Sequence, residues 1–142
     1  MILSLDLSTQ SLKCTLHAVK DGSSIDVPPV VFGTDLAADF PNTHGYNVGA
    51  NGHVTSPTLM FVAALDIMLD RLARMENVDL GLVTAVSGCG QQHGSVYWSG
   101  LPEAMPADMP LKDLLSESFA IANSPIWMDT STTAECKEFS KA

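Results

Sequence analysis

Residues 2–18 read ILSLDLSTQSLKCTLHA, and this stretch decides the fold class. Residues 2–7 are mostly apolar, which predicts a strand. Apolar and polar residues then alternate over residues 12–18, the pattern of a second strand with one wetter face. An Asp21-Gly22 turn signal follows, and residues 25–32 form a further apolar stretch interrupted by two prolines. The sequence therefore predicts a meander of three antiparallel strands.

The rest of the chain alternates between helix and strand signals. Ser56 and Pro57 suit the N-cap and first position of a helix that continues to Met75. A short β-branched run at residues 80–87 predicts a buried strand after that helix. The remaining expectations are a long loop at 33–55, a strand at 95–98, a proline-rich loop at 102–110, a short helix within 111–122, an extended piece at 126–128 and a helix from 130 capped by Asp129.

The composition excludes several classes of protein. With 46% hydrophobic and 16% charged residues, the chain has the composition of a folded domain. A net charge of -9 with scattered basic residues argues against binding to nucleic acid or anionic lipid. Three widely spaced cysteines favour reduced thiols and a cytoplasmic location, and no signal peptide or membrane span is expected. Low charge and a last helix without a stop signal predict a piece of a longer protein.

The first candidate site is the polar stretch from Asp6 to Ser11, between the first two predicted strands. Backbone N–H groups and hydroxyls in such a hairpin can surround a phosphate, and Asp6 can hold Mg²⁺ through water. An ordinary hairpin turn is the alternative interpretation.

The second candidate site is Ser87-Gly88-Cys89-Gly90-Gln91-Gln92-His93-Gly94, at the end of a predicted strand. Glycines allow a ligand to approach the backbone, and Gln and His side chains offer donors and acceptors to sugar hydroxyls. A solvated glycine-rich turn remains the alternative. Cys89 and His93 are poor candidates for a nucleophile or a metal site, because the sequence clusters too few partners around them.

The third candidate is Trp127-Met128-Asp129, in which an aromatic ring stands beside a carboxylate. The ring could stack on a sugar while Asp129 binds its hydroxyls. On local grounds, a buried Trp127 and a helix-capping Asp129 are the favoured interpretation. Tyr97 and Trp98 are expected in the core.

Together these segments resemble the FGGY carbohydrate kinases, and most closely the xylulokinases among them. Residues 3–13 are similar to the first phosphate-binding hairpin of that family. Residues 86–98 are similar to its sugar-binding segment, and residues 124–134 match the stretch that follows. Three motifs in the expected order are more specific than any one alone, and the resemblance extends over nearly the whole chain.

The resemblance implies an α/β fold: an incomplete ribonuclease-H-like, actin-like ATPase domain with a mixed sheet and flanking helices. Residues 1–142 would be the amino-terminal part of the first kinase domain, with a phosphate hairpin at 6–13 and a sugar-binding loop at 87–98. The rest of that domain and the whole second domain would lie outside this sequence. So would the family's catalytic aspartate, and Asp129 is not that base.

The implied reaction is transfer of the γ-phosphoryl group of ATP to D-xylulose, giving xylulose 5-phosphate. By the resemblance, Asp6 serves Mg²⁺, and the ketose contacts are Gln92, His93 and Asp129. The nucleotide phosphates face Ser8, Thr9, Gln10 and Ser11. The expected partners are ATP, the ketose and the remainder of the kinase chain, and the isolated chain is expected to be inactive. Two alternatives stay open: a kinase of another pentulose or hexulose, and a truncated, non-catalytic sugar-binding module.

Overall fold

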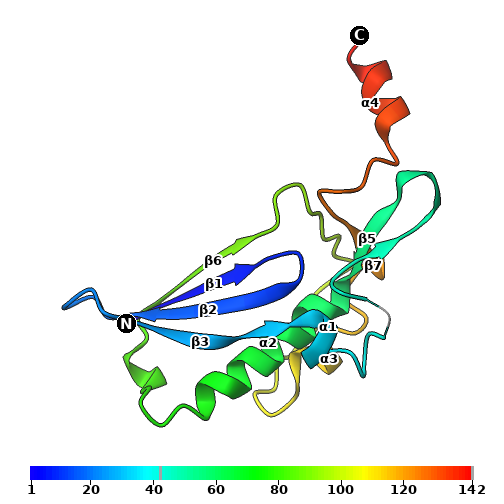
Figure 1. Cartoon of the computed structure of the whole chain (residues 1–142). Coiled ribbons are helices and arrows are strands. Elements are labelled where there is room, and N and C mark those ends of the chain that lie inside the picture. The colour runs from blue at the N-terminus through cyan, green and yellow to red at the C-terminus, as the bar shows by residue number, and fades with distance from the viewer. Residues whose placement is uncertain (42, 142) are drawn as a thin grey trace.

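The computed structural model of the chain describes residues 1–41 and 43–141. Its main sheet has the strand order β3-β2-β1-β6, formed by β1 (Ile2–Leu7), β2 (Ser11–His17), β3 (Ser24–Val31) and β6 (Ala85–Gly90). β1 and β2 pair antiparallel, as do β2 and β3, whereas β6 runs parallel to β1 (Figure 1). The predicted meander is therefore confirmed, and the sheet is mixed. Residue 42, in the predicted loop 33–55, and residue 142, the last of the predicted segment, lie outside the described residues.

One face of this sheet packs on the long helix α2 (Thr58–Ala73), which contacts β2 and β3. Alternation along β2 buries Leu12, Cys14 and Leu16 on that face and leaves its other residues more accessible. On α2, side chains spaced three or four residues apart share one face of the helix, and this face packs against the buried face of the sheet. The buried side chains on the helix are Thr58, Met60, Ala63, Ala64, Met68 and Leu72.

A second, smaller sheet has the order β4-β5-β7, from β4 (Asn47–Val48), β5 (Val54–Pro57) and β7 (Asn123–Pro125). The prediction of a loop over 33–55 is therefore wrong in part. That region also holds the short helix α1 (Phe32–Asp35) and the turn η1 (Ala50–Gly52). The extended piece predicted at 126–128 lies slightly earlier, in β7.

The predicted start of the long helix is wrong by one residue. Pro57 occupies the N-cap position, and no side chain caps the helix there. Ser56 lies in β5, where its hydroxyl donates a hydrogen bond to the carbonyl of Gly45. The Thr58 N–H instead donates to the carbonyl of Ala122, 2.9 Å away. A distant backbone carbonyl thus replaces the local cap that the sequence pattern favours.

The strand predicted to be buried at 80–87 is shifted and exposed. Residues Leu80–Leu82 form the turn η2, and every residue of the following strand, β6, is exposed. β6 is the edge strand beside β1, whereas α2 packs against β2 and β3. An apolar run predicts burial, but within the described residues no element covers β6.

Three predictions for the second half of the chain need correction. Residues 95–98 form no strand, only a single bridge between Trp98 and Phe119, and Tyr97 and Trp98 are 52% and 51% exposed instead of lying in the core. The short helix predicted within 111–122 is confirmed as α3 (Leu111–Leu114). The last helix, α4 (Thr133–Phe139), follows Thr132 at its N-cap position and not Asp129. The loop at 102–110 is confirmed.

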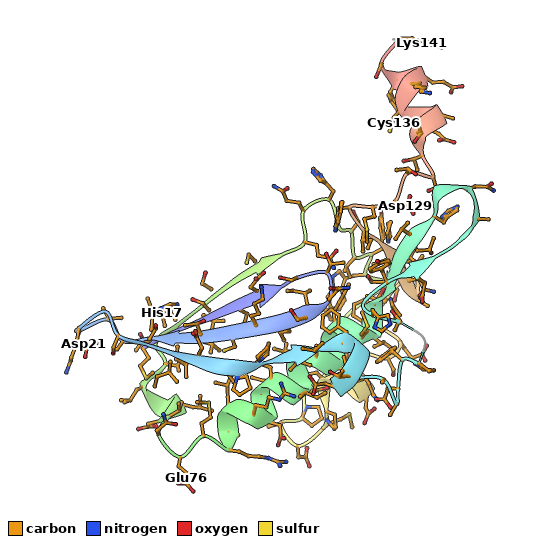
Figure 2. All side chains as sticks on the ribbon, viewed as in Figure 1. His17, Asp21, Glu76, Asp129, Cys136 and Lys141 are labelled. Atoms are coloured by element: carbon orange, nitrogen blue, oxygen red, sulfur yellow. The ribbon has the colours of Figure 1, made fainter. Side chains whose placement is uncertain are left out.

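Helix α4 projects away from the two sheets (Figure 1). The side chains in Figure 2 show that Cys136 and Lys141 stand on this projecting segment, far from the β1–β2–β3 layer. Over residues 1–41 and 43–141, no helix is both long and apolar enough to cross a membrane.

Candidate functional site

The first two sequence motifs meet because β1 and β6 are parallel neighbours. In their register Asp6 lies opposite Cys89, and Leu7 lies opposite Gly90. The carboxyl ends of both strands therefore open at the same edge of the sheet, where open α/β sheets bind ligands. The hairpin after β1 and the loop after β6 begin side by side there.

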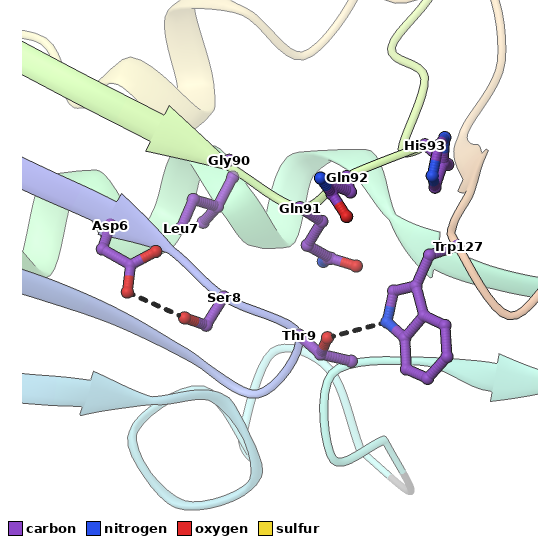
Figure 3. Close-up of a pocket in the computed structure, with 9 residues that line it drawn as sticks. All are labelled: Asp6, Leu7, Ser8, Thr9, Gly90, Gln91, Gln92, His93 and Trp127. Atoms are coloured by element: carbon purple, nitrogen blue, oxygen red, sulfur yellow. Dashed lines mark hydrogen bonds between the residues drawn. The ribbon is translucent and has the colours of Figure 1, made fainter.

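A cavity of about 460 Å³ lies at this edge (Figure 3). Its walls come from the hairpin, the loop after β6 and the segment after β7. The lining residues are Asp6, Leu7, Ser8, Thr9, Gly90, Gln91, Gln92, His93 and Trp127. Residues from all three sequence motifs thus share one cavity.

Asp6 is the only carboxylate among these lining residues. One of its oxygens accepts a hydrogen bond from Ser8 Oγ at 3.1 Å, and Lys13 Nζ lies 3.6 Å from the same oxygen. Partial desolvation acts to raise the pKa of the Asp6 carboxyl, but hydrogen bonds from Cys89 and Ser8 and the charge of Lys13 outweigh it. The pKa of Asp6 therefore lies below its usual value. At neutral pH this side chain is an ionised oxygen donor.

The predicted phosphate-binding residues divide between two neighbouring cavities. Ser8 and Thr9 line both, whereas Gln10 and Ser11 line only the second, an open cavity of about 430 Å³ that also touches Lys13. The hairpin is closed by a 2.9 Å hydrogen bond from Ser8 N–H to the Ser11 carbonyl. The hairpin therefore lines this second cavity with the hydroxyls of Ser8, Thr9 and Ser11. The ammonium group of Lys13 lies at the same cavity.

Gly45 holds the neighbouring loop against this hairpin. Its φ of +116° is favourable only for glycine, and a Cβ at this position would collide with the carbonyl of Thr9. The loop around Gly45 therefore packs closely against the hairpin at Thr9.

Gln92 and His93 are exposed at the mouth of the main cavity. His93 has a φ of +58°, in the left-handed region that non-glycine residues seldom adopt. Such backbone strain concentrates at ligand-binding sites. His93 is the last residue of this loop that lines the main cavity, and the chain leaves the cavity after it.

Trp127 is 54% exposed, so the expectation of a buried tryptophan is wrong. Its indole N–H donates a 3.1 Å hydrogen bond to Thr9 Oγ1, across 118 positions of sequence. One face of the cavity is therefore an indole tied to the hairpin (Figure 3). An aromatic surface in such a place suits the apolar C–H face of a sugar.

Asp129 does not line the cavity. Its side chain is only 9% exposed and lies 3.8 Å from His53 Nδ1. Its two oxygens accept hydrogen bonds from Val54 N–H at 2.8 Å and from the N–H and hydroxyl of Ser131 at 3.1 and 2.6 Å. The Ser131 hydroxyl and the Val54 N–H lower the pKa of Asp129. Asp129 joins β5 to the segment that carries Trp127, and it does not cap α4.

Cys89 lies beside Asp6 and not beside His93. Its Sγ donates to an Asp6 oxygen at 3.4 Å, and this bond to a carboxylate raises the pKa of the Cys89 thiol. A protonated thiol is a weak nucleophile. Within the described residues, no three His, Cys, Asp or Glu side chains come together as a metal site.

Gln91 belongs to the second motif but is not among the predicted site residues. It lines the main cavity between Gly90 and Gln92. The sequence signal was its place in the Gln-Gln-His run, but alternation alone could not show which glutamine faces inward.

The fold of this chain is that of the sugar kinases. It superposes on a ligand-bound xylulose kinase from Lactobacillus acidophilus with a TM-score of 0.56 at 14% identity. It superposes on a gluconate kinase from the same organism with a TM-score of 0.58 at 16% identity. Both superpositions cover 99% of this chain and 22% of the other. The predicted actin-like fold class, an incomplete α/β domain with a mixed sheet, is confirmed.

The sequence comparison narrows this similarity to xylulose kinases. The chain is 42% identical to Xylulose kinase 2 of Arabidopsis thaliana over 100% of its length, and 39% identical to the xylulose kinases of Mus musculus and Saccharomyces cerevisiae over 99% and 96%. It matches none of the known protein-family profiles. Over its whole length the chain therefore resembles xylulose kinases, and it shares its fold with solved sugar kinases. It spans about a quarter of the length of these relatives, 26%, 26% and 23% respectively.

Proposed function

We propose that this chain is the amino-terminal segment of a kinase that transfers the γ-phosphoryl group of ATP to D-xylulose, giving xylulose 5-phosphate. The observation that carries the proposal is the single cavity into which the hairpin and the Gln-Gln-His loop both open. A phosphoryl transfer requires its donor and its acceptor to be held side by side. The proposed location is the cytoplasm.

In this proposal the hairpin at 6–13 faces the nucleotide. Ser8, Thr9, Gln10 and Ser11 offer hydroxyl, amide and backbone donors to the phosphates. Lys13, 3.6 Å from Asp6, adds one positive charge at the same hairpin. These groups fit a polyphosphate that approaches from the open side of the hairpin.

Asp6 fits Mg²⁺ as a single, ionised carboxylate. Mg²⁺ is commonly held by one or two carboxylates together with water and substrate phosphates, so one carboxylate suffices. When bound, the ion neutralises phosphate charge. The contribution of the chain is to hold the Asp6 carboxylate in its charged form through Ser8 and Lys13.

The loop at 87–98 faces the sugar. Gln92 and His93 supply hydrogen-bonding groups at the mouth of the cavity, and Trp127 supplies an apolar wall. Asp129 does not line the cavity, and both of its oxygens accept hydrogen bonds from Val54 or Ser131, so its proposed role toward the ketose is indirect. Its hydrogen bonds to Val54 and Ser131 support a role in fixing the position of this wall. The base that takes the hydroxyl proton is proposed to lie in the remainder of the kinase chain.

The test is an ATP-dependent phosphorylation assay with the native gene product that contains this chain. We expect turnover of D-xylulose with Mg²⁺, and a loss of about 100-fold in Asp6→Asn, as for a lost transition-state contact. Asp26→Asn is the matched control, because Asp26 lies on β3 and accepts from Thr15 at 2.8 Å, away from the cavity. The isolated chain of residues 1–142 should show no turnover.

The assay also separates the alternatives. Preferred turnover of another ketose would assign a different pentulose or hexulose kinase, because sugar specificity depends on a few hydroxyl contacts. Ketose binding that is independent of ATP, with no phosphorylation of any ketose, would favour a non-catalytic sugar-binding module. Turnover by the isolated chain at the rate of a complete kinase would contradict the proposal.

A further inference from the structure

The side-chain amide of Gln91 is enclosed, yet it has no hydrogen-bond partner. Among the described residues, both Nε2 and Oε1 are shielded from solvent and neither is bonded. An amide offers two donors and an acceptor with two lone pairs. Buried polar groups are nearly always paired, so an orphaned amide requires an explanation.

Within the described residues, the surroundings of Gln91 make no hydrogen bond to its amide. Gln91 stands between the main cavity and a smaller one of about 160 Å³, and it lines both. The smaller cavity is walled largely by apolar side chains, among them Leu7, Phe61, Val96 and Ile126. Figure 3 shows the Gln91 side chain directed into the space between the hairpin and Trp127.

We propose that Gln91 is a further substrate-binding residue, whose amide bonds two hydroxyl groups of the ketose. This inference rests on the proposed function. A sugar hydroxyl both donates and accepts, as the two ends of an amide require, whereas an anion would be repelled by Oε1. The terminal torsion of glutamine is soft, so a small rotation turns the amide toward the ligand.

Without ligand, the unpaired amide of Gln91 destabilises the folded chain. A bound sugar that pairs the amide removes this destabilisation. Sites of this kind discriminate strongly, because an analogue that lacks the hydroxyl leaves the buried amide unpaired again. Gln91 would then act on specificity, whereas the exposed Gln92 contributes to affinity at the mouth of the cavity.

The experiment measures binding of D-xylulose and of its monodeoxy analogues to the native gene product by calorimetry. Gln91→Met keeps the length of the side chain and removes its polar atoms. We expect about 10-fold weaker binding of D-xylulose. We also expect that the wild type rejects one or two deoxy analogues, while Gln91→Met binds them as it binds D-xylulose.

Thermal stability without ligand is the second readout. Removing an unpaired buried amide should leave the melting temperature unchanged or raise it, whereas a structural role would lower it. Asn77→Leu, an amide-to-apolar change at an exposed position remote from the cavity, is the control.

Unchanged affinity in Gln91→Met, or an equal loss for every analogue, would overturn the role of Gln91 while ketose binding by the wild type stands. Failure of the wild type to bind or phosphorylate any ketose would instead overturn the proposed function.

Discussion

The hydrogen bond between Trp127 and Thr9 should couple the proposed sugar-facing side of the cavity, formed by Trp127, to the proposed phosphate-binding hairpin at 6–13. The indole N–H lies 3.1 Å from Thr9 Oγ1. Thr9→Val removes the acceptor with little change in shape, and Trp127→Phe removes the donor and keeps an aromatic ring. A neutral hydrogen bond contributes about 0.5–1.5 kcal/mol, and the half-exposed indole places this bond at the lower end, about 0.5–1 kcal/mol.

A double-mutant cycle isolates this bond from the other effects of each change. We expect a coupling of about 2- to 5-fold in D-xylulose affinity, the equivalent of about 0.5–1 kcal/mol. The assay is calorimetric titration of the native gene product and of the single and double variants. Thr15→Val combined with Trp127→Phe is the control, because Thr15 bonds Asp26 on the meander and should show no coupling. Additive effects of Thr9→Val and Trp127→Phe would refute the reasoning.

Two further predictions concern the framework of the site. Leu16→Ala, at a fully buried position on β2, should lower the free energy of unfolding by about 2–5 kcal/mol in urea titration, whereas Leu69→Ala, 42% exposed on α2, should cost under about 1 kcal/mol. The folded-state pKa of Asp6 is depressed, so its stabilisation is present above the unfolded pKa and is lost as the pH falls through the folded pKa. Melting temperatures below about pH 4 should therefore fall more steeply for the wild type than for Asp6→Asn, and parallel curves would contradict this.

The sheet meander could be predicted because its signals are local. Alternation along β2 and the Asp21-Gly22 turn fix which residues face α2, and both follow from neighbours in sequence. The body of α2 is predictable for the same reason. Its start is not, because the cap depends on Ala122, which lies more than sixty positions away.

The failures share one physical cause, a partner that is remote in sequence. Asp129 resembles a helix cap locally, but its carboxylate binds Val54, 75 positions earlier. Asp66 has the pattern of a solvated helix face, yet it accepts the backbone N–H groups of Leu111 and Lys112, both at 2.8 Å. The predicted burial of β6 is wrong because a strand is buried only where another element packs against it. An apolar run in the sequence does not show whether such an element exists. The motifs predicted most of the residues that line the cavity. The unpaired amide of Gln91 could not be predicted, because it depends on how the surrounding segments pack.

The pairing of β1 with β6 explains why the two motifs must be neighbours. Parallel strands require a long crossover, and here the connection between β3 and β6 includes α2 and two strands of the small sheet, β4 and β5. Because the pairing is parallel, both strands deliver their following loops to one edge, and the register sets Leu7 beside Gly90. A shift of one residue would exchange the faces of every side chain on β6. Gln91 directly follows β6, so the same shift would turn its side chain away from the hairpin, and the register therefore determines how Gln91 enters the cavity.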